Sequence, residues 1–153
     1  TDRDGKETHK LKYLGTRATM APEVALQQAD LEMDNMVDIT REMFGLTRAY
    51  TAGETNDKET FERINHLEDI TDNIEEEMIN FVTALLTSPV TQSQSTRSYT
   101  LIRMADEMES IADSLQSLSI YRSRLFKRKV GMSPLQYRQR FGRLARELQG
   151  LAG

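Results

Sequence analysis

The 153-residue sequence contains no cysteine and no tryptophan, only three prolines and eight glycines, and only two histidines. The lack of cysteine excludes disulfides, thiolate nucleophiles and thiolate zinc sites. His9 and His66 stand at no recognisable metal spacing, and neither follows a glutamate by three residues, as in di-iron helical bundles. The chain also has no evident Ser-His-Asp set and no glycine-rich phosphate loop. These absences predict a protein that is not an enzyme.

Long apolar runs are missing as well. The longest ones, such as 84–86, fall well short of the roughly 18–20 residues that cross a bilayer, and the polar start at 1–7 does not resemble a signal peptide. The chain begins without methionine, so we expect it to be a fragment of something longer. Its length fits one domain.

Proline and glycine fall between long segments whose apolar residues repeat at helical spacing. The first predicted helix starts at Pro22 and ends at Gly53, and its methionine-rich stripe is interpreted as core. The second is capped by Asn56 or Asp57 and ends near 88–89. These patterns indicate long, amphipathic helices.

The second half of the chain continues this pattern. The polar stretch 91–98 is expected to be a loop or a frayed start, because Ser and Thr side chains compete with the backbone for hydrogen bonds. A third apolar stripe then runs to Gly131, and Ser133-Pro134 opens a shorter helix. The prediction is an all-α, up-down helical bundle, with an approach segment at 1–20, the bundle at 21–130 and a basic C-terminal helix at 131–153.

Charge is distributed unevenly along the sequence. Up to Tyr121 there are 11 basic and 23 acidic residues, a net charge of −12, whereas the remainder has 9 basic and 1 acidic residue, a net charge of +8. The net charge of −4 hides this division. Such asymmetry suggests a tail with its own partner or an acidic body with a binding role.

An acidic motif occurs twice, once in the second predicted helix and once in the third. Segments 67–74 and 108–115 share the pattern apolar-Glu-x-Ile-x-Asp-x-apolar, with carboxylates at Glu68 and Asp72 and at Glu109 and Asp113. Both pairs flank the apolar stripe on the same side, and like charges four residues apart are mildly destabilising. A cation bound between the two helices would explain them, and a solvated acidic face is the alternative. Asp34 and Asp38 repeat only the spacing.

These motifs, each inside a long helix, resemble those of PhoU-type phosphate-signalling proteins. The stretch 9–14, together with 21–26, Leu31-Glu32 and Met36, is similar to the segment that follows the membrane part of bacterial sodium/phosphate cotransporter-related proteins. The resemblance covers roughly residues 9–130. The sequence departs from the family at Ser110-Ile111-Ala112, where Arg-Ile-Gly is frequent, and complete PhoU proteins have two bundles where this chain has one.

The resemblance implies a PhoU-like cytoplasmic domain, associated with a membrane through its parent transporter, that regulates sodium-dependent phosphate uptake. It further implies that Glu68, Asp72, Glu109 and Asp113 bind a divalent or trivalent metal ion, with iron, zinc, manganese and magnesium as candidates. The implied partners are a membrane transport domain, a signalling partner and a second copy of the chain.

The basic tail supports a competing interpretation. Residues 107–148 resemble one helix-turn-helix unit of AraC-type transcription regulators, with 120–130 as the recognition helix. In that case nucleic acid would meet the basic side chains Arg122, Arg124, Lys127, Arg128 and Lys129. Within the PhoU-like interpretation the same residues complement the helix dipole, pair with the acidic body or face an anionic membrane surface. A continuous helix over 116–120 would exclude the helix-turn-helix. A metal-free helical interaction module is the third alternative.

Overall fold

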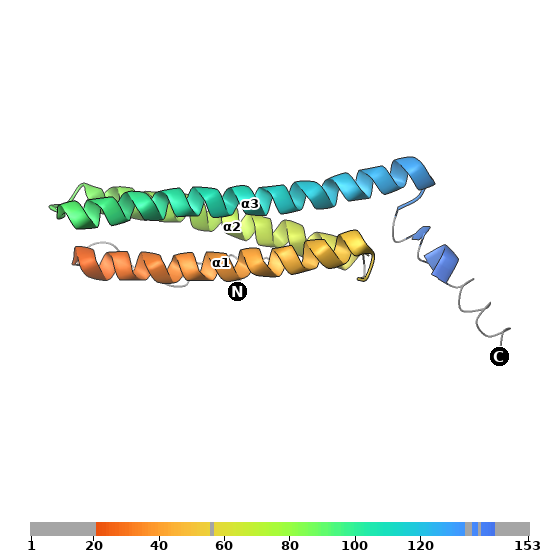
Figure 1. Cartoon of the computed structure of the whole chain (residues 1–153), viewed down its shortest axis with the longest axis horizontal. Coiled ribbons are helices and arrows are strands. Elements are labelled where there is room, and N and C mark those ends of the chain that lie inside the picture. The colour runs from red at the N-terminus through yellow and green to blue at the C-terminus, as the bar shows by residue number, and fades with distance from the viewer. Residues whose placement is uncertain (1–20, 56, 134–135, 138, 143–153) are drawn as a thin grey trace, which may run out of the picture.

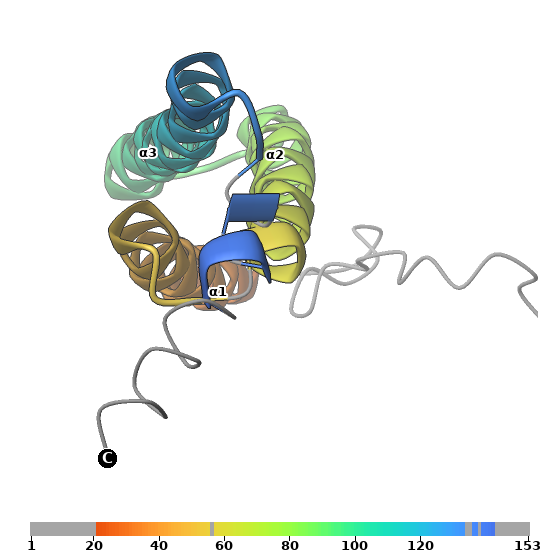
Figure 2. The same ribbon diagram turned by 90° about the vertical axis from the view of Figure 1, so that its right-hand side faces the viewer.

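The computed structural model describes residues 21–55, 57–133, 136–137 and 139–142. It contains three long helices, α1 (Pro22–Ala52), α2 (Asp57–Leu86) and α3 (Gln92–Val130), which lie side by side around a common axis (Figures 1 and 2). Short helical segments at 136–137 and 139–142 follow α3, and the described residues include no strand. The predicted all-α, up-down bundle is confirmed.

Helix boundaries follow from local backbone chemistry. Pro22 is the first residue of α1. A backbone N–H at this position would have no intrahelical acceptor, so the N–H that proline lacks costs no hydrogen bond. Gly53 and Gly131 end α1 and α3 in the left-handed conformation, with φ of 78° and 71°, which glycine adopts without steric cost. Both predicted helix ends are confirmed. Asn56, one of the two predicted caps of α2, lies outside the described residues.

The start of α3 corrects the prediction for 91–98. Thr91 caps the helix, since its hydroxyl accepts a hydrogen bond from the Gln94 backbone N–H at 3.2 Å. In return, the Gln94 side chain accepts from the Thr91 backbone N–H at 2.9 Å. This reciprocal capping box supplies the hydrogen bonds that a polar helix start lacks, so α3 begins at Gln92 rather than after a loop.

The core lies along the bundle axis and is formed by all three helices. The methionines of the α1 stripe are buried, which confirms their interpretation as core residues rather than a binding groove. Buried aliphatic side chains contribute about 1.5–3 kcal/mol each relative to exposure, so this stripe supplies much of the packing energy. The largest fully buried apolar side chains are Leu26, Met36, Met43, Tyr50, Ile64, Leu67, Ile74, Met78 and Val82.

Helix α3 is continuous through residues 116–120, which excludes the helix-turn-helix interpretation of 107–148. Instead of the turn expected near 117–119, Ser119 is buried inside the bundle. Its hydroxyl donates to the Leu115 carbonyl at 3.0 Å and lies 3.5 Å from the Thr47 hydroxyl of α1. A separate recognition helix starting near Ile120 is therefore wrong, because the core contact holds this stretch within α3.

After α3 the chain bends sharply, and the next described segment lies at the end of the bundle (Figures 1 and 2). Ser133 and Gln136 form a second reciprocal cap, with distances of 3.2 and 2.9 Å, which confirms the predicted helix start there. The Tyr137 ring packs edge-on against Phe126 of α3, with centroids 5.2 Å apart. The rest of the predicted C-terminal helix, at 143–153, lies outside the described residues, as does the approach segment 1–20 with His9.

Candidate functional site

The four predicted carboxylates lie on the adjoining stretches of α2 and α3. These helices pack against each other and run in opposite directions. Glu68 and Glu109 are half-buried beside the core, whereas Asp72 and Asp113 are exposed. The Gln116 amide of α3 donates a hydrogen bond of 2.8 Å to the Glu68 carboxylate of α2, which ties the two helices together at this point.

Electrostatic coupling joins these carboxylates into one group. Partial burial raises the pKa of Glu68 most, and the neighbouring charges Asp69, Asp72, Asp113 and Glu109 raise it further. Partial burial likewise raises the pKa of Glu109, followed by the charges of Asp113, Asp72 and Asp106. Both motifs therefore contribute to one negative field that crosses the α2–α3 interface.

Two members of this group, Glu75 and Asp106, were not predicted from the sequence. The pKa of Glu75 is raised by burial and then by Glu109, Asp106 and Asp72. Glu75 follows Glu68 by seven residues, and Asp106 precedes Asp113 by seven, so each lies two turns along the same helix face. This seven-residue spacing is the sequence pattern from which both residues could have been predicted. We call Glu68, Asp72, Glu75, Asp106, Glu109 and Asp113 together the acidic face.

The acidic face has no basic partner in the part of the chain that the structure describes. The six ion pairs found there all involve other carboxylates. The weak third copy of the motif on α1 differs, because Asp38 pairs with Arg41. Among the described residues, no three acidic or histidine side chains come close enough to hold a metal ion. The carboxylates of the acidic face are thus neighbours whose oxygens do not converge on one point.

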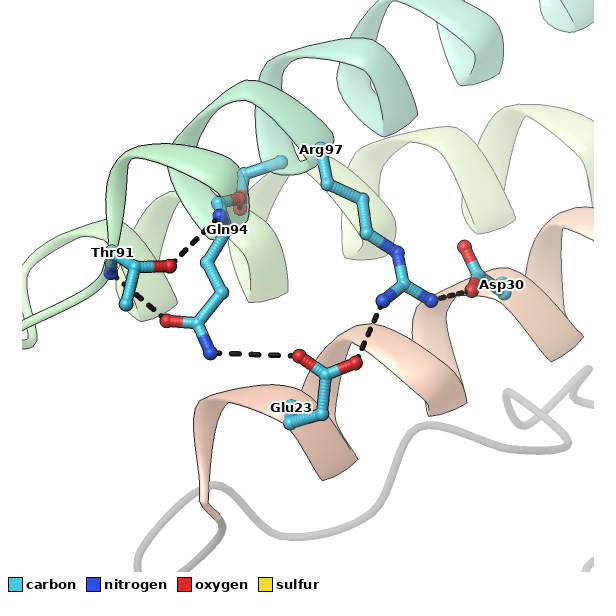
Figure 3. A network of polar contacts seen from close by, with 6 residues as sticks. Glu23, Asp30, Thr91, Gln94 and Arg97 are labelled. Carbon is cyan, nitrogen blue, oxygen red and sulfur yellow. Dashed lines mark hydrogen bonds and ion pairs between the residues drawn. The ribbon is translucent and has the colours of Figure 1, made fainter.

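A second acidic group, at the first turns of α1, is paired. Arg97 of α3 donates to Glu23 at 3.0 Å and also to Asp30 (Figure 3). Gln94, part of the α3 cap, reaches the same Glu23 carboxylate at 3.5 Å. The hydrogen bond to Asp30 is the main cause that raises the pKa of the Arg97 guanidinium. This network connects the start of α3 to the start of α1, and we call it the Arg97 network.

Fold and site together define an all-α bundle with an unpaired acidic face between two of its helices. A family model described as PhoU domain matches residues 33–119, more than half of the chain, and this range includes both acidic motifs. The chain belongs to the PhoU domain family, whose members are regulatory domains of phosphate homeostasis rather than enzymes. No curated protein and no solved structure matched the chain. None of the described helices is both long and apolar enough to cross a membrane.

Proposed function

We propose that this chain is a metal-binding regulatory domain that controls sodium-dependent phosphate uptake. The observation that carries the proposal is the acidic face, where burial and then the neighbouring carboxylates raise the pKa values of Glu68, Glu75 and Glu109 at the α2–α3 interface. Like charges are held together there at a cost in stability. Membership of the PhoU domain family supplies the link to phosphate regulation.

In this proposal Glu68, Asp72, Glu109 and Asp113 hold the metal ion. Carboxylate oxygens are hard ligands that suit magnesium, manganese and iron, and zinc also accepts them. Asp72 and Asp113 are exposed, so their side chains can rotate toward a cation without disturbing the core. Bound metal supplies positive charge, which offsets the repulsion between the two motifs.

The regulatory step follows from the position of these residues. A cation shared by α2 and α3 would fix the packing of the two helices, which carry the motifs near the middle of the bundle. The bundle would then present one defined surface to a membrane transport domain or a signalling partner. Residues of this chain act by orienting and binding, and no bond is made or broken.

The proposed location and partner rest on the likeness of 9–14, 21–26, Leu31-Glu32 and Met36 to the corresponding segment of sodium/phosphate cotransporter-related proteins. We propose that the domain works on the cytoplasmic side of a membrane, next to a sodium/phosphate cotransporter of the same or an associated chain. Loss of the domain should then change how sodium-dependent phosphate uptake responds to external phosphate. Uptake that is identical in cells with and without the domain would contradict this part of the proposal.

Metal binding is tested on purified protein by elemental analysis and by calorimetric titration with magnesium, manganese, iron and zinc salts in turn. We expect stoichiometric binding of at least one metal, and its loss in the Glu68→Ala/Asp113→Ala variant. The matched control is Asp34→Ala/Asp38→Ala, which removes an acidic pair of α1 and should bind as the unchanged protein does. Absence of binding in the unchanged protein, or binding that survives the first variant, would overturn the metal site.

A further inference from the structure

A hydrogen bond from α3 reaches across the helix interface into the acidic face. The Gln116 side-chain amide donates to the Oε2 atom of Glu68 at 2.8 Å. Both side chains are half-buried, so water competes less for this contact than for one on the open surface. In the described part of the chain, the other five carboxylates of the acidic face accept no hydrogen bond from a side chain. Glu68 is therefore the carboxylate of this group whose position the bundle fixes most closely.

Gln116 belongs to the same face of α3 as the acidic motif. It follows Glu109 by seven residues and Asp113 by three. At about 100° per residue, these separations place it about 20° and 60° around the helix from the two motif carboxylates. Because α2 and α3 run in opposite directions, this end of the α3 motif lies level with Glu68, the first motif residue of α2. Gln116 thus extends the α3 motif by one turn with a neutral donor.

Its lack of charge distinguishes Gln116 from Arg97, which connects helices in the other acidic group. Arg97 pairs with Glu23 and Asp30, so it offsets their charges as well as fixing their positions. Gln116 donates to Glu68 without adding a charge, so the negative field of the acidic face is retained. A neutral amide can therefore hold this carboxylate in place and leave its attraction for a cation intact.

A fixed carboxylate matters here because the oxygens of the acidic face do not converge. Among the described residues, no three acidic or histidine side chains come close enough to hold a metal ion. The exposed Asp72 and Asp113 can rotate toward a cation, but ordering each of them costs conformational entropy. Glu68 is already ordered by its hydrogen bond, so it can bind without that cost. Loss of such a hydrogen bond to a metal ligand typically lowers metal affinity by about 10–100-fold.

We propose that Gln116 is a positioning residue of the metal site, an inference that rests on the proposed function. Its amide occupies one oxygen of Glu68 and leaves the other for the cation, so Glu68 contributes a single ligand atom. Calcium takes roughly six to eight oxygens and often binds both oxygens of a carboxylate, whereas magnesium and manganese prefer an octahedral set of about six. Gln116 therefore favours an octahedral ion such as manganese over calcium.

Calorimetric titration of the full chain with manganese chloride and, separately, with calcium chloride tests this inference. Gln116→Met keeps the length of the side chain but lacks the donor, and we expect its dissociation constant for manganese to rise about tenfold. The constant for calcium should rise less, because Glu68 is then free to bind through both oxygens. The control is Gln92→Met, the same change at an exposed position near the start of α3, which should leave both constants unchanged. Circular dichroism checks that both variants remain folded.

The outcomes separate this inference from the proposed metal site itself. If Gln116→Met binds both ions as the unchanged protein does, the amide positions nothing. An equal loss for manganese and calcium would give Gln116 a purely structural role. Either result overturns the inference and leaves the metal site standing. A preference for calcium in the unchanged protein would also overturn it. Binding of no metal at all would overturn the proposed site, and the inference with it.

A second variant separates hydrogen-bond donation from charge. Gln116→Arg keeps N–H donors but adds a positive charge beside Glu68. In metal-free protein it should raise the thermal unfolding midpoint, because a cation then offsets the like charges of the acidic face. It should also weaken manganese binding more than Gln116→Met does, since it loses the attraction for a cation. A Gln116→Arg protein that binds manganese as tightly as the unchanged protein would contradict the placement of Gln116 at the metal site.

Discussion

Two acidic regions of this bundle are built from the same residue types and differ in one respect. At the start of α1, Glu23 and Asp30 share the guanidinium of Arg97, which comes from α3 (Figure 3). At the α2–α3 interface, Glu68 and Glu109 have only other carboxylates as charged neighbours in the described chain, and their pKa values are raised. The comparison shows that a basic side chain, here Arg97, lets an acidic group connect two helices through ion pairs. Among the described residues, the acidic face has no such cation, and this difference is the basis of the proposal that it binds a metal ion.

Removing Arg97 should have the largest effect on stability. Arg97→Ala leaves Glu23 and Asp30 without their shared cation, so we expect the free energy of unfolding to fall by about 1–2 kcal/mol, a value reduced for partial exposure. Urea denaturation measures it. The control is Arg103→Ala, whose side chain makes only an exposed contact of 3.9 Å with Glu107, and it should change stability by less than about 0.5 kcal/mol. An equal loss of stability in Arg97→Ala and Arg103→Ala would contradict the view that the Arg97 network stabilises the bundle more than an exposed ion pair does.

The cap of α3 belongs to the same region and should contribute somewhat less. Thr91→Ala removes the hydroxyl that accepts from the Gln94 N–H, which should cost about 1 kcal/mol. Thr100→Ala, at an exposed position inside the helix, should be neutral within about 0.5 kcal/mol. Thermal unfolding of the two variants beside the unchanged protein provides the comparison. A Thr91→Ala protein of unchanged stability would mean that the cap does not hold the start of α3.

In the acidic face, removing a charge at neutral pH should raise the free energy of unfolding rather than lower it. Because the folded pKa of Glu75 lies above its ordinary value of 4.5, protonation favours the folded state. This stabilisation by protonation is fully present at pH values below 4.5, the ordinary pKa of glutamate. It is lost as the pH rises through the higher pKa of Glu75 in the folded protein. In metal-free protein at pH near 7, Glu75→Gln should therefore gain a few tenths of a kcal/mol, because one like charge is gone.

The gain from Glu75→Gln should disappear near pH 4, where the unchanged protein is itself largely protonated at this position. Urea denaturation at the two pH values measures both effects. A variant that is less stable than the unchanged protein at neutral pH would show that the acidic face stabilises the bundle. The comparison between the two regions would then fail.

The fold could be predicted from the sequence because its signals are local. Pro22, Gly53 and Gly131 mark helix ends through their own backbone properties, and apolar spacing marks the buried faces. The stretch 91–98 was mispredicted because composition suggested fraying, whereas a specific reciprocal pair, Thr91 and Gln94, supplied the cap.

The site was only partly predictable. The motif pairs carboxylates four residues apart, so it predicts Glu68 and Asp72 but not Glu75, which belongs to the same face at a spacing of seven. The pairing of Arg97 with Glu23 and Asp30 depends on how α1 and α3 pack, over a separation of about seventy residues, which no local pattern reveals. The sequence alone therefore could not show which acidic groups have a basic partner, and the structure was needed to identify them.

The central claim is that the unpaired acidic face, and not the Arg97 network, binds a cation. It is tested most directly by the metal-induced rise in the thermal unfolding midpoint of two matched double variants. Asp72→Asn/Glu109→Gln removes two charges from the acidic face, and Glu23→Gln/Asp30→Asn removes two from the Arg97 network, with little change in shape. We predict that metal raises the midpoint of the unchanged protein and of the second variant, but not that of the first. An equal rise in both variants, or no rise in any of the three proteins, would contradict the claim.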